Sequence, residues 1–265
     1  ALQPDGCFVG ELDGTAVATI AAFIFGPVAW IAMVLVDVES RRRGVATTLL
    51  KHALDFLDRQ GAKTIRLDAT AAGQPVYEKL GFVPEYPLTR YMGTAPVASG
   101  GTLKRSVGAA SAIESAPSAK PSALTLPCGT HPQWDAVVAF DEQTTATPRG
   151  KMLVRLFEES PDLTQVLCRN GQVAGYVTGR HGANATLIGP CIAATDAGPD
   201  LLRHALARCA GQPVFLDVPR DNAPAVQVAE QSGLTAQRHF MRMCRGARLR
   251  DHVESIWATS GPEKG

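Results

Sequence analysis

Apolar residues in the first third of the chain follow two different periods. Runs of β-branched and aromatic residues indicate buried strands, and one longer segment places its apolar residues on a single face at helical spacing. Gly26-Pro27 marks a turn between two such strands, and Gly61 ends the helix. The expected elements are strands at about 7–12, 16–25 and 28–38, a helix at 45–60, a strand at 64–69, a helix at 74–80 and a strand pair near 82–92.

The second half of the chain repeats this pattern. LLKHAL at 49–54 corresponds to LLRHAL at 201–206, an offset of 201 − 49 = 152. Each run precedes a short strand ending in Leu-Asp, a helix with Pro near its start and a Gly that ends this helix. The matched pairs are Asp68 and Asp217, Pro75 and Pro224, and Gly81 and Gly233. Four matches in one order predict a duplicated unit.

The composition between the repeats suggests where the domains divide. An Ala/Ser/Gly/Pro-rich stretch predicts a linker, and the residues from Leu124 to the second hairpin are expected to form one strand and one or two helices. The first unit, with six residues before Cys7, is expected to lack this opening strand and its helices. The tail contains Trp257 and is expected to pack back onto the fold. The expected divisions are a domain at 1–95, a linker at 96–122, a domain at 123–248 and a tail at 249–265.

Charge and cysteine content exclude several classes of protein. The formal net charge is +1, which does not favour a nucleic-acid or anionic-membrane binder. The six cysteines are scattered, which favours reduced thiols in a cytoplasmic protein over disulfides or a metal site. Ala16 to Val36 has no charged residue and the length of a membrane span, yet the Gly-Pro in its middle favours two strands.

A short loop between a strand and the first helix carries the chemistry. Residues 34–50 read VLVDVESRRRGVATTLL, so a hydrophobic strand leads through an arginine-rich loop directly into an amphipathic helix. The start of a helix leaves N–H groups unpaired and positively polarised, and phosphate is their natural partner. Gly44 lets the backbone approach closely, Ala46 avoids a clash, and the arginines add charged donors. This arrangement predicts a diphosphate site.

The same residues resemble a known family. R-x-x-G-x-A between a strand and a helix, at Arg41–Ala46, resembles the pyrophosphate motif of the GNAT superfamily of N-acetyltransferases, and YEKLGF at 77–82 resembles its closing helix. The resemblance covers about 7–92 and extends to the second unit only in outline. It implies an α/β fold of two tandem GNAT-like domains, each a mixed central sheet flanked by helices, and acetyl-CoA as the co-substrate.

The resemblance also implies roles for single residues. The strand before the loop would bond the pantetheine arm, the loop backbone would hold the pyrophosphate, and Tyr77 would protonate the departing thiolate. Thr70 stands where many members have Asn. Asp68, at a strand end, is the candidate base for the amine, although a strand-end Asp often only caps a turn. The expected cofactor-binding residues are Val34, Leu35, Val36, Arg41, Arg42, Arg43, Gly44, Val45, Ala46, Thr47 and Thr70, with no metal ligand.

The second unit lacks these features. Its equivalent loop, 193–198, reads AATDAG, and the position of Tyr77 falls on Ala229 or Val226 depending on the alignment. We therefore expect it to pack against the first unit and wall the acceptor pocket without catalysing transfer. The leading hypothesis is an N-acetyltransferase acting on a small-molecule or peptide amine. A different acyl donor and an acyl-CoA sensor without turnover stay open, and the oligomeric state does not follow from the sequence.

Overall fold

The computed structural model of the chain describes residues 3–97 and 134–264. The predicted linker at 96–122 lies almost wholly outside these residues, as does the strand expected after Leu124. The first unit contains η1 (Pro4–Gly6), β1 (Cys7–Leu12), β2 (Thr15–Phe25), β3 (Val28–Val36), η2 (Val38–Ser40), α1 (Val45–Arg59), β4 (Thr64–Thr70), α2 (Gln74–Glu78) and β5 (Val83–Thr94).

The second unit follows the same order of elements after two additional helices. One closing segment, which we define as residues 249–264, comes after its last long strand. The elements are α3 (Trp134–Thr145), α4 (Gly150–Glu159), β6 (Gln165–Arg169), β7 (Gln172–His181), β8 (Thr186–Ala193), α5 (Gly198–Arg208), β9 (Pro213–Pro219), α6 (Ala223–Gln231), β10 (Thr235–Gly246), η3 (Val253–Ser255) and β11 (Ile256–Ala258).

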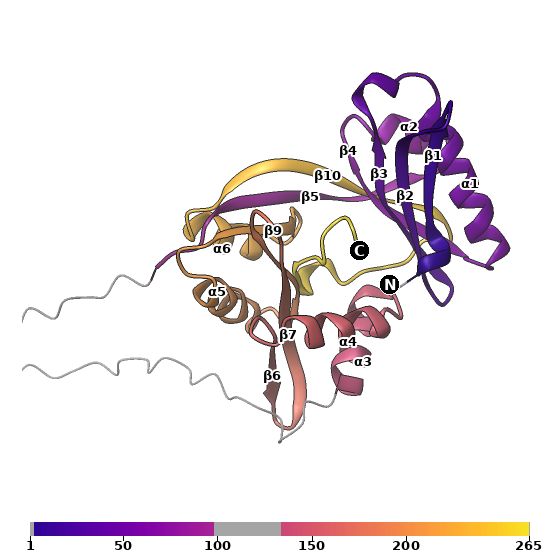
Figure 1. Cartoon of the computed structure of the whole chain (residues 1–265). Coiled ribbons are helices and arrows are strands. Elements are labelled where there is room, and N and C mark those ends of the chain that lie inside the picture. The colour runs from indigo at the N-terminus through magenta and orange to yellow at the C-terminus, as the bar shows by residue number, and fades with distance from the viewer. Residues whose placement is uncertain (1–2, 98–133, 265) are drawn as a thin grey trace, which may run out of the picture.

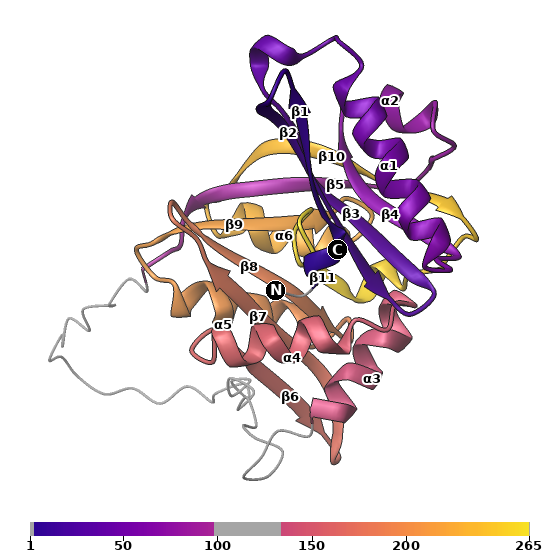
Figure 2. The ribbon, with the colours of Figure 1, turned by 45° about the vertical axis from the view of Figure 1, so that its right-hand side comes forward.

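The two units exchange their last long strands. Within the described residues, one sheet has the order β1-β2-β3-β4-β10-β5-β9-β8-β7-β6, with β11 added to β8. Thus β10 of the second unit completes the sheet of the first, and β5 of the first unit completes that of the second. Figures 1 and 2 show β5 and β10 crossing between the units as a pair of long ribbons. The expected strand pair near 82–92 is therefore wrong, because the partner of β5 comes from the other repeat.

The exchanged strands are related by the duplication itself. Leu88 pairs with Phe240, and 240 − 88 = 152 is the offset that relates the two LL-K/R-HAL runs. Each strand therefore meets its own equivalent in antiparallel register, as a two-fold relation requires. Tyr91 of β5 lies in the hydrophobic core of the second unit, and Met243 of β10 lies in that of the first. The units share their cores and form one body.

The helices cover the sheet on different faces. The apolar face of α1 packs on the first unit's sheet through Leu50, Ala53 and Leu57, which are all almost fully buried. On the opposite face, α3 and α4 of the second unit pack against Trp30 of β3 in a third cluster. The uncharged stretch from Ala16 to Val36 forms β2 and β3, as predicted. Among the described residues, no helix has the length and apolarity needed to cross a bilayer.

Candidate active site

A V-shaped opening separates β3 from β4 in the first unit. The two parallel strands pair only from Val28 with Thr64 to Trp30 with Arg66, and beyond this point β3 has no neighbour on that side. Between Thr19 and Ala21 of β2 the register shifts, and Met33 has φ of 53°, so β3 carries a bulge inside the opening. The Thr19 hydroxyl bonds the carbonyl of Met33 at 3.0 Å. Backbone groups of β3 beyond the bulge therefore face an open edge.

The predicted pantetheine-binding residues lie at this open edge. Val34 and Val36 are half-buried and pack toward the α1 side, whereas Leu35 points to the other face and is exposed. A strand with free backbone groups and apolar side chains suits an amide-bearing flexible arm, because the arm can add to the sheet edge. The structure places Val34, Leu35 and Val36 on this unpaired part of β3, and their binding of a pantetheine arm stays a prediction.

The start of α1 lies at the wide end of the opening. Gly44 is its N-cap with φ of 82°, and no side chain caps the helix. The first helical bond runs from the Thr48 N–H to the Gly44 carbonyl at 3.0 Å, so the N–H groups of Val45, Ala46 and Thr47 precede it. A Cβ added at Gly44 would meet nothing within 4 Å. Open space and unpaired donors at a positive helix end fit a diphosphate.

The three arginines of the loop are all exposed beside this helix start. Arg41 donates from Nε to the carbonyl of Val36 at 3.2 Å, which ties the loop to the end of β3. Arg42 adopts φ of 61°, so the backbone turns sharply before Gly44. Arg42 and Arg43 leave their guanidinium groups in solvent, where they supply positive charge without a fixed partner among the described residues. The predicted residues 41–47 thus gather around one point.

Tyr77 and Thr70 lie on the far side of the opening. Tyr77 is buried on α2 and packs edge-on against Phe82 with the ring centroids 5.9 Å apart. A Cβ added at Gly73 would come within 3.0 Å of the Tyr77 ring and 3.5 Å of the Thr70 hydroxyl, so the two side chains are neighbours. Burial raises the pKa of Tyr77 to about 12, so the phenol keeps its proton at neutral pH. The Thr70 hydroxyl accepts from the Gly73 N–H at 3.2 Å.

Asp68 has a different environment from the one a general base needs. Both of its carboxylate oxygens accept from Arg242 of the exchanged strand, at 2.9 and 3.0 Å, and its side chain is 1% exposed. An oxygen already bonded to a guanidinium and closed to solvent is badly placed to take a proton from an amine. The Arg242 guanidinium also donates to the Tyr86 hydroxyl at 2.8 Å.

The second unit contains the same ion pair. Asp217 accepts from Arg90 at 2.7 and 2.6 Å, and Arg90 corresponds to Arg242 because 90 + 152 = 242. This pair occurs in a unit that has neither the arginine loop nor the tyrosine. We therefore interpret both pairs as anchors of the exchanged strands, and the expected role of Asp68 as base is replaced by a structural one.

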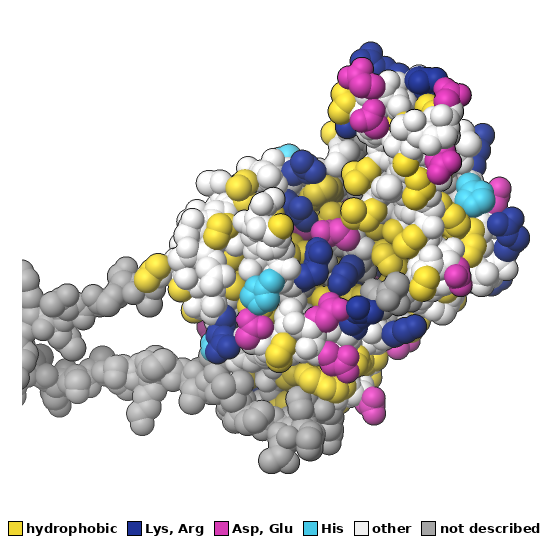
Figure 3. All heavy atoms as spheres, in the orientation of Figure 1, with side chains coloured by type: hydrophobic (Ala, Val, Ile, Leu, Met, Phe, Trp, Pro, Cys, Tyr) yellow, Lys and Arg dark blue, Asp and Glu magenta, His cyan; other side chains and the backbone are white. Residues whose placement is uncertain are grey.

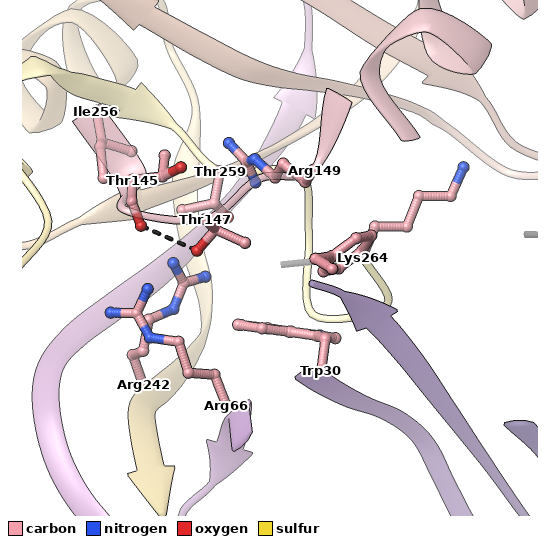
Figure 4. A pocket seen from close by; sticks show the side chains of 10 residues that line it. Trp30, Arg66, Thr145, Thr147, Arg149, Arg242, Ile256, Thr259 and Lys264 are labelled. Carbon is pink, nitrogen blue, oxygen red and sulfur yellow. Dashed lines mark hydrogen bonds between the residues drawn. The ribbon is translucent and has the colours of Figure 1, made fainter. Parts of the chain in front are cut away.

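A small cavity lies where β3 and β4 begin to part. It has a volume of ≈ 20 Å³, and both units contribute to it. Figure 4 shows Trp30 and Arg66 of the first unit, with Arg242 of the exchanged strand β10, on one side and other residues of the second unit on the opposite side. Figure 3 shows charged side chains gathered where the units meet, beside a hydrophobic area of the first unit. The lining residues are Phe25, Trp30, Arg66, Thr145, Thr147, Arg149, Arg242, Ile256, Thr259 and Lys264.

Sequence reasoning missed these cavity residues. Arg66 and Asp68 alternate along a strand that is otherwise apolar, and this period-two pattern of charges inside a buried strand is the signal that could have found them. Arg66 binds Glu85 and Asp251 at 2.8 and 2.9 Å and is almost fully buried. Its partners lie 19 and 185 residues away, so the sequence alone did not join them.

The loop of the second unit is unsuited to phosphate. Asp196 occupies the position equivalent to Gly44 and pairs with Arg169 of β6. This ion pair with Arg169 lowers the pKa of Asp196, so the loop carries a fixed negative charge. With a carboxylate at this position and no arginine in the loop, 193–198 offers little to an anionic ligand.

Comparison with known families and structures agrees with the geometry. The model of the acetyltransferase (GNAT) family matches residues 1–82, and a model of an acetyltransferase (GNAT) domain matches residues 137–258. The chain is 25% identical over 224 residues to an uncharacterized N-acetyltransferase, YitH, of Bacillus subtilis (strain 168), covering 83% of this chain and 72% of that protein.

Solved structures show the same architecture. A proposed acetyltransferase from Pyrococcus horikoshii has a TM-score of 0.74 at 24% identity, covering 100% of this chain and 82% of that one. A tandem GNAT protein from the clavulanic acid biosynthesis pathway has a TM-score of 0.53 at 18% identity, covering 91% and 82%. The chain belongs to the GNAT acetyltransferase family and carries two such domains in tandem.

Proposed function

We propose that the first unit is an acetyl-CoA-dependent N-acetyltransferase that acts on a primary amine, carried by a small molecule or a peptide. The observation that carries this proposal is the uncapped start of α1, which lies beside exposed arginines and opens onto the unpaired edge of β3. The N–H groups of Val45, Ala46 and Thr47, together with Arg42 and Arg43, would hold the diphosphate, and the backbone of 34–36 would bind the pantetheine.

The residues around the opening suit direct transfer of an acetyl group. A neutral amine attacks the thioester carbonyl, which develops negative charge while the thiolate departs. Backbone N–H groups of β3 beyond its last pair with β4 would stabilise this charge. Tyr77 would donate its proton to the thiolate, and its pKa of about 12 ensures that it holds a proton to give. Thr70 would orient the arm next to Tyr77.

The acceptor would approach from the face of the first sheet that lies opposite α1. On that face β3 and β4 begin to part beside the cavity. Helices α3 and α4 of the second unit pack against the same face. The amine would thus meet the thioester at the narrow end of the opening, with one wall from each unit. An acyl-CoA sensor is the second candidate, because the binding features would serve it without Tyr77.

Calorimetry with acetyl-CoA, followed by a panel of amines scored by release of the CoA thiol, tests the proposal. We expect one molecule bound per chain and turnover of at least one amine. Arg43→Glu should weaken acetyl-CoA binding at least ~10-fold, because it reverses a charge beside the diphosphate. The matched control is Arg59→Glu, a charge reversal in the last turn of the same helix, which should change the Kd by less than about twofold.

The outcomes separate the two candidates. Binding without turnover of any amine favours the sensor. Absence of any heat from acetyl-CoA with the folded protein overturns both, because they share the binding site.

A further inference from the structure

The closing segment follows a path that joins both units. Its Asp251 accepts from Arg66 of β4 at 2.9 and 3.0 Å and from the Tyr86 hydroxyl at 2.6 Å. It then crosses the second unit as β11 and returns to the first, where the carbonyl of Pro262 accepts from Trp30 Nε1 at 3.0 Å. Figure 1 shows it in the middle of the molecule, between the two sheets. The segment is therefore held at both ends by residues of the first unit.

The middle of the segment fills an opening in the second unit that is equivalent to the opening between β3 and β4 in the first unit. β8 and β9 pair only at Thr186 and Leu187 and then separate, as β3 and β4 do. β11 lies in this gap: Ile256 pairs with Ile192 of β8, and the Thr259 N–H donates to the carbonyl of Asp217 of β9 at 2.9 Å. The segment thus bonds the strands on both sides, and the chain itself occupies the position of a pantetheine arm.

Two glycines of the second unit make room for this occupant. A Cβ on Gly198, at the start of α5, would lie 1.7 Å from the Trp257 ring, and a Cβ on Gly189, in β8, would lie 2.0 Å from the carbonyl oxygen of Thr259. Gly198 corresponds to Ala46, where the first unit would bind phosphate, because 46 + 152 = 198. Trp257 is fully buried and donates from Nε1 to the Ala193 carbonyl at 3.3 Å. The slot is shaped around the segment.

The part of the segment beyond β11 forms one side of the cavity at the narrow end of the first unit's opening. Thr259 and Lys264 line this cavity together with Trp30, Arg66 and Arg242. In Figure 4 the Lys264 side chain leads away from Trp30, and its ammonium group points away from Arg66 and Arg242. Glu263 is held by Arg180 of β7 at 2.7 Å. The second unit thus fixes the wall that the first unit presents to its acceptor.

We propose that the second unit is the docking site of its own closing segment, and that the docked segment forms the acceptor-facing wall of the first unit. This makes Trp257 a positioning residue for the acceptor: it does not touch the reacting atoms, but it keeps Pro262 bonded to Trp30 and Lys264 in the lining of the cavity. The role of the wall in acceptor binding rests on the proposed acetyltransferase function. The docking of the segment does not.

A pair of full-length variants tests the proposal. Trp257→Ala removes the anchor, and Trp257→Phe keeps an aromatic ring in the slot; both are made with Trp134→Phe, so that Trp30 becomes the only tryptophan of the chain. With Trp257→Ala we expect fast hydrogen exchange at 256–259, a red shift of Trp30 emission as Pro262 leaves, and an acceptor KM raised roughly tenfold. The kcat and the acetyl-CoA Kd should stay within about twofold. Trp257→Phe should restore most of each property.

Arg180→Ala is a second variant that disturbs the acceptor-facing wall. It removes the half-exposed ion-pair partner of Glu263 and leaves Trp257 in place. It should raise the acceptor KM about threefold while the amides at 256–258 stay protected. This variant keeps the test decisive if Trp257→Ala does not fold.

Each outcome decides one part of the proposal. Unprotected amides at 256–259 in the unsubstituted chain overturn the docking, and protected amides in Trp257→Ala overturn the role of Trp257 as the anchor of the segment. Release of the segment with unchanged Trp30 emission and unchanged acceptor KM overturns the wall. If acetyl-CoA binds but no amine is acetylated, the proposed enzymatic function fails, and Trp30 emission and hydrogen exchange still decide whether the segment is docked against the first unit.

Discussion

The ends of β3 and β8 occupy equivalent places in the two units and have opposite environments. Beyond the bulge of β3, Leu35 is 57% exposed and borders an open gap. Near the end of β8, Ile192 is fully buried, and β11 pairs with it in the corresponding gap. Both sheets diverge at the same place, so the divergence belongs to the fold. Whether a ligand or the chain fills the gap depends on a few residues at the helix start and on the closing segment.

This difference shows how a sheet that diverges in this way can be filled by its own chain. An empty apolar slot would leave unpaired backbone groups and exposed apolar surface, both of which cost stability. In the second unit, β11 satisfies the backbone groups and Trp257 covers the apolar surface. The first unit leaves its slot open, which fits a site that binds and releases a co-substrate.

The anchors of the exchanged strands give the largest expected effect. Arg242→Ala leaves Asp68 buried without its guanidinium and should lower the free energy of unfolding by about 3–5 kcal/mol. The matched change Arg90→Ala should cost less, about 2–3 kcal/mol, because the side chain of Arg90 is 15% exposed and water can reach the site. Urea denaturation of both variants measures the difference. Equal losses below about 1 kcal/mol would contradict the role of these pairs as anchors.

Local sequence patterns predicted the individual elements of the fold. The helix at 45–60 and the strands near 7–12, 16–25 and 64–69 match α1, β1, β2 and β4 closely, since each has a clear apolar period and a Gly or turn at its end. The tail with Trp257 packs back, as expected. The strand exchange was not predictable, because β5 would fit either sheet equally well by its pattern. Only the relative position of the units selects the neighbour of β5.

The part of the candidate site that comes from one contiguous segment was predictable. The part that depends on contacts between distant segments was not. Residues 41–47 are contiguous, so a strand, a loop and a helix start suffice to place them around one point. Asp68 was assigned from its position at a strand end, but its environment depends on Arg242, which is 174 residues away. The alternation of Arg66 and Asp68 signals a buried charged network without naming its partners.

Tyr77, the proposed proton donor, is present in the first unit and has no equivalent in the second. Tyr77→Phe should lower kcat about 100-fold, because the departing thiolate loses its proton donor, and should leave the acetyl-CoA Kd unchanged. The equivalent positions of the second unit, Val226 and Ala229, already lack a hydroxyl. Steady-state kinetics and calorimetry on the same preparation measure both quantities. An unchanged kcat would remove Tyr77 from the mechanism.

Alkaline pH should weaken the core around Tyr77. Burial raises its pKa from 10.0 to about 12, so the folded state keeps the proton while the unfolded state loses it. The free energy of unfolding should therefore fall as pH rises from 10 to 12, by about 2–3 kcal/mol for this residue. Tyr86 and Tyr176 add to the fall, since burial raises their pKa values too. Urea titrations should show a shallower decline for Tyr77→Phe; an identical slope would contradict the burial of its hydroxyl.

The smallest expected effect concerns why the second unit would not bind acetyl-CoA. It tests whether the closing segment, more than the missing arginine, prevents this binding. Thr195 and Asp196 are exposed and correspond to Arg43 and Gly44, so the double variant Thr195→Arg, Asp196→Gly restores charge and a flexible turn with little disturbance. Calorimetry should still find one acetyl-CoA per chain, because β11 fills the gap between β8 and β9 whatever the loop carries. The same double variant combined with Trp257→Ala separates the two barriers. A second binding site in the double variant alone would show that electrostatics was the only barrier, and that the segment gives way to a ligand.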